Sequence, residues 1–198
     1  LEAFVAARPL LASTLEGRPW RAQVESTLGP WHERLVPHLP ALPAAWTHGD
    51  GHASNFLWRG DAVTAVLDLG LADRTTPLLD LATAVERHCV SWLDAEPVVR
   101  LDLLDALVAG WHATRPLSTA EVGALPAVLP LVHVEFALSE AAYFHSVTRS
   151  PTNTELAYDG FSLGHCRWYA GARGRALLEH LARGPVPFGT GGQDLGPC

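Results

Sequence analysis

The sequence of 198 residues contains no methionine and only three cysteines. The cysteines, Cys89, Cys166 and Cys198, lie far apart and form no CxxC pair, so neither a disulfide framework nor a thiolate zinc site is predicted. This cysteine usage is typical of a reducing compartment, and we expect a cytoplasmic protein. Because the chain starts at Leu1 without a methionine, we also expect a trimmed product or a piece of a longer protein.

Long apolar runs are also missing. The longest one, LPAVLPLVHVEFAL at 125–138, is interrupted by Pro130, His133 and Glu135. It is shorter than the roughly 20 residues that a membrane-spanning helix needs, and the first residues do not resemble a signal peptide. We therefore predict no association with a membrane.

Positive charge is scarce as well. The chain has 14 basic against 21 acidic residues and a formal net charge of −7. Nucleic acids and anionic membranes are bound through clustered Lys and Arg, so neither is an expected partner. Since 48% of the residues are hydrophobic and 18% are charged, the chain can bury the core of one domain.

Most of the chain has the residue pattern of helices, and β signals are confined to 45–70. There, SNFLW at 54–58 and AVTAVLDL at 62–69 predict a hairpin turned by RGD at 59–61. The predicted fold class is therefore α+β and mainly helical, with one small hairpin. Helices are expected at the N-terminus up to about Leu39, over 77–93, from Pro97 to about Thr114, from the capping box STAE at 118–121, over 131–147, and over 153–183 with a break near Gly171.

The segment AWTHGDGHASNFLW at 45–58 concentrates the polar chemistry. It contains His48, Asp50, His52 and Asn55 between apolar flanks, and Asp68 follows in VLDLG. Carboxylate and amide oxygens are the ligands that Mg²⁺ prefers, and Mg²⁺ shares its remaining positions with nucleotide phosphates. A loop Asp, an Asn five residues later and a further metal-binding Asp are also the parts of a phosphoryl-transfer site.

Three motifs carry a resemblance to a known family. HGDGHASNFLW, AVLDLGLAD and PLLDLATAVE occur in this order and resemble the catalytic lobe of the aminoglycoside phosphotransferase family, which is related to choline and homoserine kinases. The likeness is close over 46–93 and general over the helical remainder. It implies a protein-kinase-like C-terminal lobe whose hairpin carries the catalytic and metal loops. The implied function is ATP-dependent transfer of the γ-phosphate to a hydroxyl of a small molecule, such as an aminoglycoside, an amino alcohol or a homoserine-like compound.

The resemblance also implies roles for individual residues. Asp50 would be the catalytic base or would orient the acceptor hydroxyl, and Asn55 and Asp68 would bind the Mg²⁺ that bridges the ATP phosphates. His48, His52 and Asp80 would support the loop. Gly51 and Leu69 differ from the residues common in the family, but neither change removes a reacting group.

A nucleotide-covering lobe is not recognisable in the chain. Such a lobe needs a phosphate loop and a strand lysine, and neither precedes the cluster. We therefore divide the chain into a C-terminal, catalytic and substrate lobe at 1–183 and a Gly/Pro-rich tail at 184–198. On this interpretation the 198 residues alone turn over little ATP.

Two other functions remain open. His48, Asp50 and His52 alternate along HGDGH and could hold a transition metal for a metal-dependent hydrolase, although the other histidines are scattered along helices. A catalytically inactive kinase-like binding module is the non-enzymatic alternative. The acceptor is not readable from the sequence. Residues that could bind it are Asp73, Arg74, Glu135 and Glu140.

Overall fold

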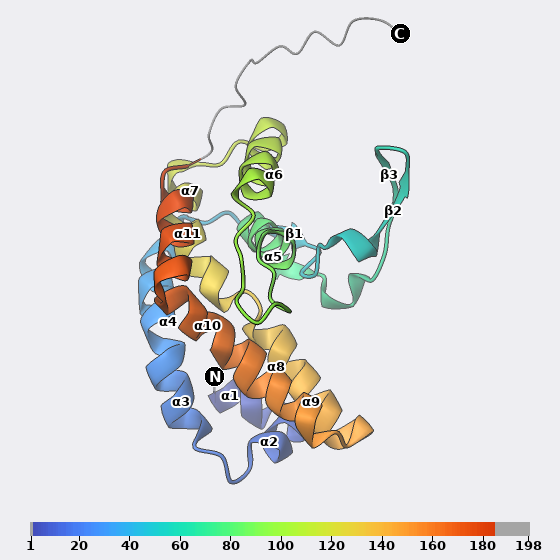
Figure 1. Ribbon diagram of the computed structural model, residues 1–198, viewed down its shortest axis with the longest axis vertical. Coiled ribbons are helices and arrows are strands. Elements are labelled where there is room, and N and C mark those ends of the chain that lie inside the picture. The colour runs from blue at the N-terminus through green and yellow to red at the C-terminus, as the bar shows by residue number, and fades with distance from the viewer. Residues whose placement is uncertain (1, 185–198) are drawn as a thin grey trace, which may run out of the picture.

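The computed structural model describes residues 2–184. Helices form the body of the molecule, and a two-stranded hairpin projects from one side of it (Figure 1). The prediction of a mainly helical chain with a small β hairpin is confirmed. The predicted tail at 184–198 lies, except for Gly184, outside the described residues.

Short helices make up the first forty residues. Proline occupies the first turn of several of them, where its missing N–H costs no hydrogen bond. The helical character predicted up to about Leu39 ends as an α-helix at Leu35, and a 3-10 turn with Pro37 in its first positions follows. The elements are α1 Glu2–Ala6, α2 Pro9–Leu15, α3 Trp20–Thr27, α4 Gly29–Leu35 and the 3-10 helix Val36–Ala41.

The strands form two antiparallel pairs. β2 Phe56–Arg59 pairs with β3 Ala62–Val66 and makes the predicted hairpin. β1 Ala45–Thr47 pairs with β4 Asp73–Thr75, a pairing that the sequence analysis did not predict. This pairing joins the residues just before His48 to the residues just after DLG at 68–70. The chain from 48 to 72, including the β2–β3 hairpin, is therefore held together at its two ends.

Helix α5, Pro77–Cys89, lies at the centre of the core. Leu78, Leu81, Ala82 and Val85 on one of its faces are completely buried. Burying each larger side chain of this kind contributes about 1.5–3 kcal/mol. The buried face fixes the orientation of α5, so its opposite face is held against the loop between β1 and β2.

The following helices agree with the sequence pattern apart from one boundary. The capping box of Ser118 and Glu121 opens α7 as predicted. The helix expected from Pro97 begins only at Leu101, since Val99 is extended and forms an antiparallel bridge with Val90. The bounds are α6 Leu101–Thr114 and α7 Thr119–Val128.

Of the last helices, α10 and α11 lie on the side of the body away from the hairpin, and α8 and α9 lie at its lower end in the view of Figure 1. The predicted break near Gly171 is confirmed, because α10 ends at Ala170 and α11 begins at Ala172. The elements are the 3-10 turn Leu129–Leu131, α8 Val134–Tyr143, the π-helical turn Phe144–Thr148, α9 Pro151–Glu155, the π-helical segment Leu156–Leu163, α10 Gly164–Ala170 and α11 Ala172–Ala182.

One helical run is long and apolar enough to cross a membrane by length and composition alone. It extends over Thr119–Thr148, and half of its most apolar window is buried inside the protein. A core helix of a soluble protein meets the same criteria. The run is therefore weak evidence for a membrane span and is consistent with a soluble protein.

The hairpin exposes apolar side chains. Leu57, Trp58, Val63 and Val66 on its two strands are each about half exposed, and Trp46 on β1 is 76% exposed. Where such exposed apolar side chains form a patch, they commonly mark a contact with another protein surface.

Candidate active site

A sharp bend follows β1. Gly49 has a φ of +79°, a conformation that side-chain-bearing residues rarely adopt. A Cβ at this position would lie only 2.3 Å from the carbonyl oxygen of Leu71. Only glycine therefore lets the loop approach the segment after β3 so closely.

Asp80 in the first turn of α5 accepts two hydrogen bonds from this bend. Its Oδ2 accepts the backbone N–H of His48 at 2.9 Å, and its Oδ1 accepts that of Gly49 at 2.8 Å. Both carboxylate oxygens of one side chain thus fix two successive peptide units. This geometry is consistent with the supporting role predicted for Asp80.

His48 connects the bend to the end of β3. The backbone N–H of Asp50 donates to His48 Nδ1 at 3.2 Å, so Nδ1 carries no proton. In the neutral ring Nε2 then carries it and donates to the carbonyl oxygen of Leu67 at 2.8 Å. Both ring nitrogens are used, and His48 has no free lone pair for a metal.

Asp50 and Asn55 lie together at the base of the loop, and both are buried. The amide nitrogen of Asn55 donates to the backbone oxygen of Asp50 at 2.9 Å and to its Oδ2 at 3.2 Å. With that nitrogen committed to Asp50, the amide oxygen of Asn55 remains available as a hard ligand. Arg87 lies 3.2 Å from Asp50 Oδ1, and His52 Nε2 lies 3.4 Å from Oδ2.

Asp68 lies at the end of the hairpin. It has a φ of +54°, one of two positive values among the non-glycine residues that the structure describes. Its neighbour Leu67 donates a backbone hydrogen bond to the carbonyl oxygen of Asn55 at 2.8 Å. Together with the bond from His48, this contact ties the segment before Asp68 to the loop that carries Asp50 and Asn55.

A single stripe of α5 faces this loop. Besides Asp80, this stripe carries Arg87, which pairs with Asp50. It also carries His88, whose Nε2 accepts the backbone N–H of Ala53 at 3.1 Å. Burial, followed by the charges of His52 and Arg87, lowers the pKa of His88, so the neutral ring needed to accept that hydrogen bond is favoured. One helix thus supports the loop at its beginning, its centre and its end.

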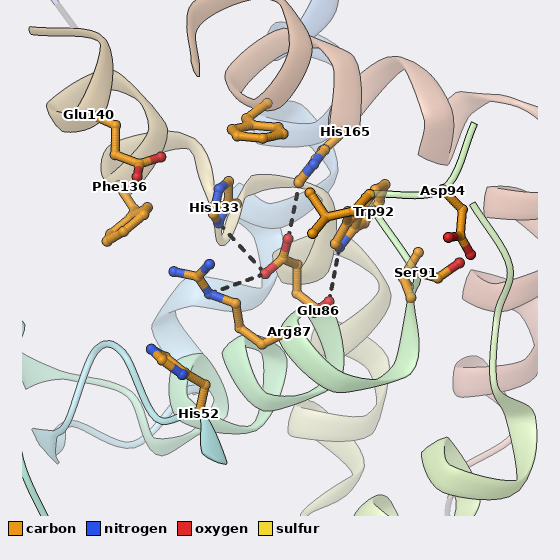
Figure 2. Close-up of a pocket in the computed structure, with 13 residues that line it drawn as sticks. His52, Glu86, Arg87, Ser91, Trp92, Asp94, His133, Phe136, Glu140 and His165 are labelled. Atoms are coloured by element: carbon orange, nitrogen blue, oxygen red, sulfur yellow. Dashed lines mark hydrogen bonds and ion pairs between the residues drawn. The ribbon is translucent and has the colours of Figure 1, made fainter. Parts of the chain in front are cut away.

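A cavity of about 600 Å³ opens beside Asp50. His52 and Arg87, which both contact the Asp50 carboxylate, line it. Figure 2 shows Glu86 in its wall, with Arg87, His133 and His165 directed toward the Glu86 carboxylate. The volume lies in the range of small-molecule sites.

Comparison with known protein families shows which family the chain belongs to. A model described as "Phosphotransferase enzyme family" matches residues 1–117, which is more than half of the chain. The chain belongs to this family. No solved structure matches it.

Several curated proteins resemble this member of the phosphotransferase family. The chain is 36% identical over 93 residues to a homoserine kinase of Methylobacterium radiotolerans, covering 46% of the chain and 28% of that protein. A homoserine kinase of Methylobacillus flagellatus is 30% identical over 140 residues, covering 64% and 43%, respectively. One of Methylorubrum populi is 29% identical over 119 residues, covering 60% and 34%. The matches thus span between about a quarter and less than half of these relatives.

The residues predicted to bind the acceptor fall into separate parts of this family member. Glu140 lines the cavity beside Asp50, whereas Asp73 and Glu135 line a second cavity of about 410 Å³ next to Gly49. Glu135 is exposed and pairs with Arg8 at 3.4 Å. Arg74 on β4 is exposed and lines neither of these two cavities.

Four residues beside the loop were missed by the sequence analysis as site residues. Glu86 and Arg87 belong to the helical pattern of 77–93 and carry no motif of their own. His133 and His165 are 32 positions apart along the chain and appeared scattered, yet both meet Glu86. Only the fold brings them together, so no local spacing could have indicated them.

Proposed function

We propose that the chain is the catalytic and acceptor-binding lobe of an ATP-dependent small-molecule kinase. The proposed reaction moves the γ-phosphate of ATP to a hydroxyl group. The observation that carries the proposal is the braced loop in which Asn55 holds the buried Asp50 while its own amide oxygen stays free. Phosphoryl transfer needs aligned reactants and compensated charge more than covalent chemistry from the protein.

Asn55 and Asp68 would hold the metal ion. An amide oxygen and a carboxylate are hard donors that fit Mg²⁺. Bound there, Mg²⁺ would neutralise charge on the ATP phosphates. The contact of Leu67 with Asn55 and the open position of Asp68 at the end of the hairpin are consistent with this assignment.

Asp50 would orient the acceptor hydroxyl and take its proton. Its Oδ1 pairs with Arg87, and Arg87 in turn lies over the ring of Phe136 at 4.6 Å from the ring centre. An acceptor that draws Arg87 toward itself would leave Oδ1 of Asp50 for the hydroxyl. Arg87 and Asp50 are thus placed to bind two ends of one small molecule.

Among the acceptors considered, we favour a homoserine-like amino acid. A guanidinium binds a carboxylate through paired hydrogen bonds, and Arg87 lines the cavity, where it would bind the carboxylate of such an acceptor. Glu140, on the same cavity, could bind an ammonium group. Burial raises the pKa of Glu140 against the opposing charge of Arg87, and a cationic partner would favour its ionised form.

Two further parts of the proposal concern the whole protein. ATP binding would require an additional nucleotide-covering lobe, and the exposed apolar side chains of the β2–β3 hairpin are consistent with such a contact. The compartment that fits this chemistry and the buried free thiols of Cys89 and Cys166 is the cytoplasm.

An ATP-consumption screen tests the proposal. Homoserine, choline and an aminoglycoside would be supplied separately, both to the 198-residue chain and to a longer form with its upstream sequence. We expect turnover with homoserine in the longer form and little turnover in the short chain. No acceptor-dependent turnover in either form would contradict the kinase assignment.

Replacing Asp68 by alanine should chiefly weaken the binding of Mg²⁺. We expect the Mg²⁺ concentration for half-maximal activity to rise about tenfold or more, because one of two protein ligands is lost. The measurement is a Mg²⁺ titration of turnover at saturating acceptor. Asp61→Ala on the exposed hairpin turn is the matched control, and an unchanged Mg²⁺ dependence in Asp68→Ala would remove Asp68 from this role.

The metal-dependent hydrolase receives less support from the geometry. His48 uses both ring nitrogens within the protein, and His52 contacts Ser54 through Nδ1 and Asp50 through Nε2. The presence of Asp50, Asn55 and Asp68 argues against an inactive binding module, because an inactive site has no need to keep all three oxygen donors. We therefore keep the kinase as the proposal.

A further inference from the structure

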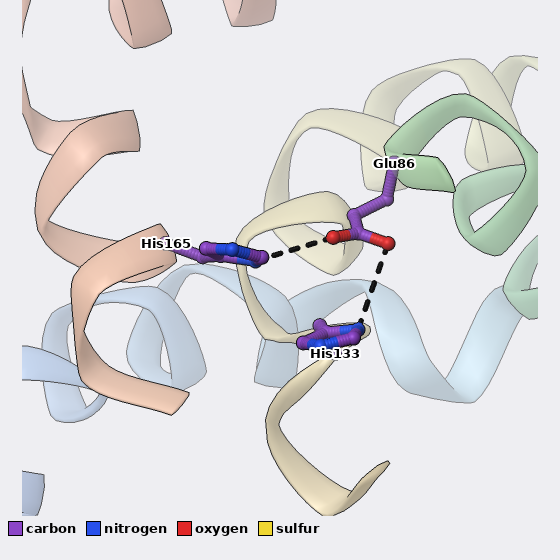
Figure 3. A group of neighbouring side chains, drawn as sticks. All are labelled: Glu86, His133 and His165. Carbon is purple, nitrogen blue, oxygen red and sulfur yellow. Dashed lines mark ion pairs between the residues drawn. The ribbon is translucent and has the colours of Figure 1, made fainter. Parts of the chain in front are cut away.

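Three buried side chains converge in the cavity wall beside the proposed active site. Glu86 comes from α5, His133 directly precedes α8, and His165 comes from α10 (Figure 3). One potential ligand atom from each residue lies within 4.8 Å of the others. We name this group the Glu-His-His cluster. It is separate from the oxygen ligands Asn55 and Asp68.

The cluster contains polar atoms without hydrogen-bond partners. Glu86 is 2%, His165 6% and His133 8% exposed. Glu86 Oε1 and His165 Nδ1 lie 3.2 Å apart, yet neither forms a hydrogen bond of acceptable geometry. Two buried polar atoms thus lie side by side without a well-formed hydrogen bond, whereas buried polar atoms normally have a partner.

The charge states suit a cation. Burial opposes ionisation of Glu86, but its neighbours, His165 first and Arg87 among them, outweigh the burial and hold the pKa of the carboxyl below its ordinary value. Burial lowers the pKa of His133 to about 4, so its ring is neutral near pH 7. An ionised carboxylate and a neutral imidazole are the forms that bind metals.

We propose that Glu86, His133 and His165 bind a divalent transition-metal ion of the Zn²⁺ class. Two imidazoles and one carboxylate form a common three-ligand set for such ions. A tetrahedral Zn²⁺ site places ligand atoms about 3.3 Å apart. Glu86 Oε1 lies 3.2 Å from His165 Nδ1, and the other carboxylate oxygen, Oε2, lies 3.6 Å from His133 Nδ1. One ligand atom from each residue lies within 4.8 Å of the others, so the carboxylate and the two imidazoles must all approach one another slightly to close around one ion.

Neighbouring groups already fix the positions of these ligands. The Trp92 ring stacks on His165 with centres 3.7 Å apart, and Trp92 Nε1 donates to the backbone oxygen of Glu86 at 2.9 Å. Such supporting contacts reduce the ordering that metal binding requires. Arg87 Nε, 3.7 Å from Glu86 Oε2, is the one neighbour that would compete with the ion among the described contacts of Glu86.

The bound ion would face the cavity. All three ligands line it, and a site with three protein ligands leaves a further coordination position open. That position could take water or an amine or carboxylate of a molecule that enters the cavity. The inference concerns metal binding and does not depend on the proposed phosphoryl transfer.

Zn²⁺ titration of the 198-residue chain in excess Mg²⁺ tests the site. A chromophoric chelator serves as competitor, and absorption after Co²⁺ substitution reports on nitrogen and oxygen ligands. We expect one equivalent of Zn²⁺ to bind. Glu86→Gln and, separately, His133→Gln should each weaken binding by about 10²-fold or more.

His180→Gln is the matched control. His180 Nε2 lies 2.6 Å from Asp105 Oδ1, which makes it another histidine–carboxylate pair outside this cavity. Its removal should leave Zn²⁺ binding unchanged. Circular dichroism checks each variant, and the two single replacements guard against one of them failing to fold. Absence of Zn²⁺ binding, or equal affinity in folded cluster variants and wild type, would overturn the proposal.

Discussion

Replacing Asp50 by asparagine should lower the rate of phosphoryl transfer by about 10²–10⁴-fold, the range contributed by a positioned acid or base. The carboxylate is the one ionisable group that the loop presents next to both Asn55 and Arg87 among the contacts described. An amide at this position cannot accept the hydroxyl proton. The expected loss is therefore in kcat, with a smaller change in KM.

The fold should survive this replacement. Asparagine has nearly the same volume, and its amide oxygen can still accept the hydrogen bond from Asn55. The contact with Arg87 is lost, but Arg87 keeps its position over Phe136 and near Glu86. Thermal unfolding should therefore occur within a few degrees of wild type.

Asp61→Asn provides the matched control, since the same chemical change then falls on an exposed turn. Turnover is measured with the acceptor identified in the ATP-consumption screen. We expect Asp61→Asn to behave as wild type. Near-normal kcat in a folded Asp50→Asn protein would remove Asp50 from its role.

The sequence predicted the parts of the site that lie close together along the chain. His48, Asp50 and Asn55 fall within eight positions, and the strand pattern before Asp68 indicated the hairpin that brings it back. Local patterns such as the STAE capping box also correctly predicted the helix that begins there. These features depend on spacing and propensity, which a sequence displays directly.

Contacts between distant elements could not be predicted in this way. The pairing of β1 with β4 involves three residues on each side, too few to produce a recognisable period. Glu86 meets His133 and His165 only in the folded chain, where α5 packs against the 3-10 turn Leu129–Leu131 that leads to His133. The first residue of α6 is Leu101 and not the predicted Pro97 for a similar reason, since the bridge between Val99 and Val90 overrides the local helical preference.

Helix α5 gives the site its organisation. Its apolar face is buried in the core, its opposite stripe supports the loop between β1 and β2, and Glu86 lies between these two faces in the cavity wall. Any displacement of α5 would therefore move Asp50 and the cavity together. Because of this coupling, we expect a residue of α5 that contacts no substrate, such as Asp80, to have a large effect on activity.

Asp80→Asn should reveal that coupling. Each charge-assisted hydrogen bond to the N–H groups of His48 and Gly49 stabilises the bend by about 1.5–3 kcal/mol. Asparagine retains one acceptor but turns its NH₂ group toward the second N–H, and two donors repel each other. We expect kcat to fall by about 10²-fold, the cost of displacing a reacting group by roughly 1 Å.

The control separates this bracing from a general helix effect. Asp102 also lies in the first turn of its helix, α6, where a carboxylate favours the helix dipole, but it is exposed and has no described bond to the loop. Asp102→Asn should therefore leave kcat unchanged. Hydrogen exchange should show faster exchange at His48 and Gly49 in Asp80→Asn only. Unaltered protection of both amides, even with reduced activity, would mean that Asp80 acts by some route other than holding the bend, because those two N–H groups are the ones its carboxylate accepts.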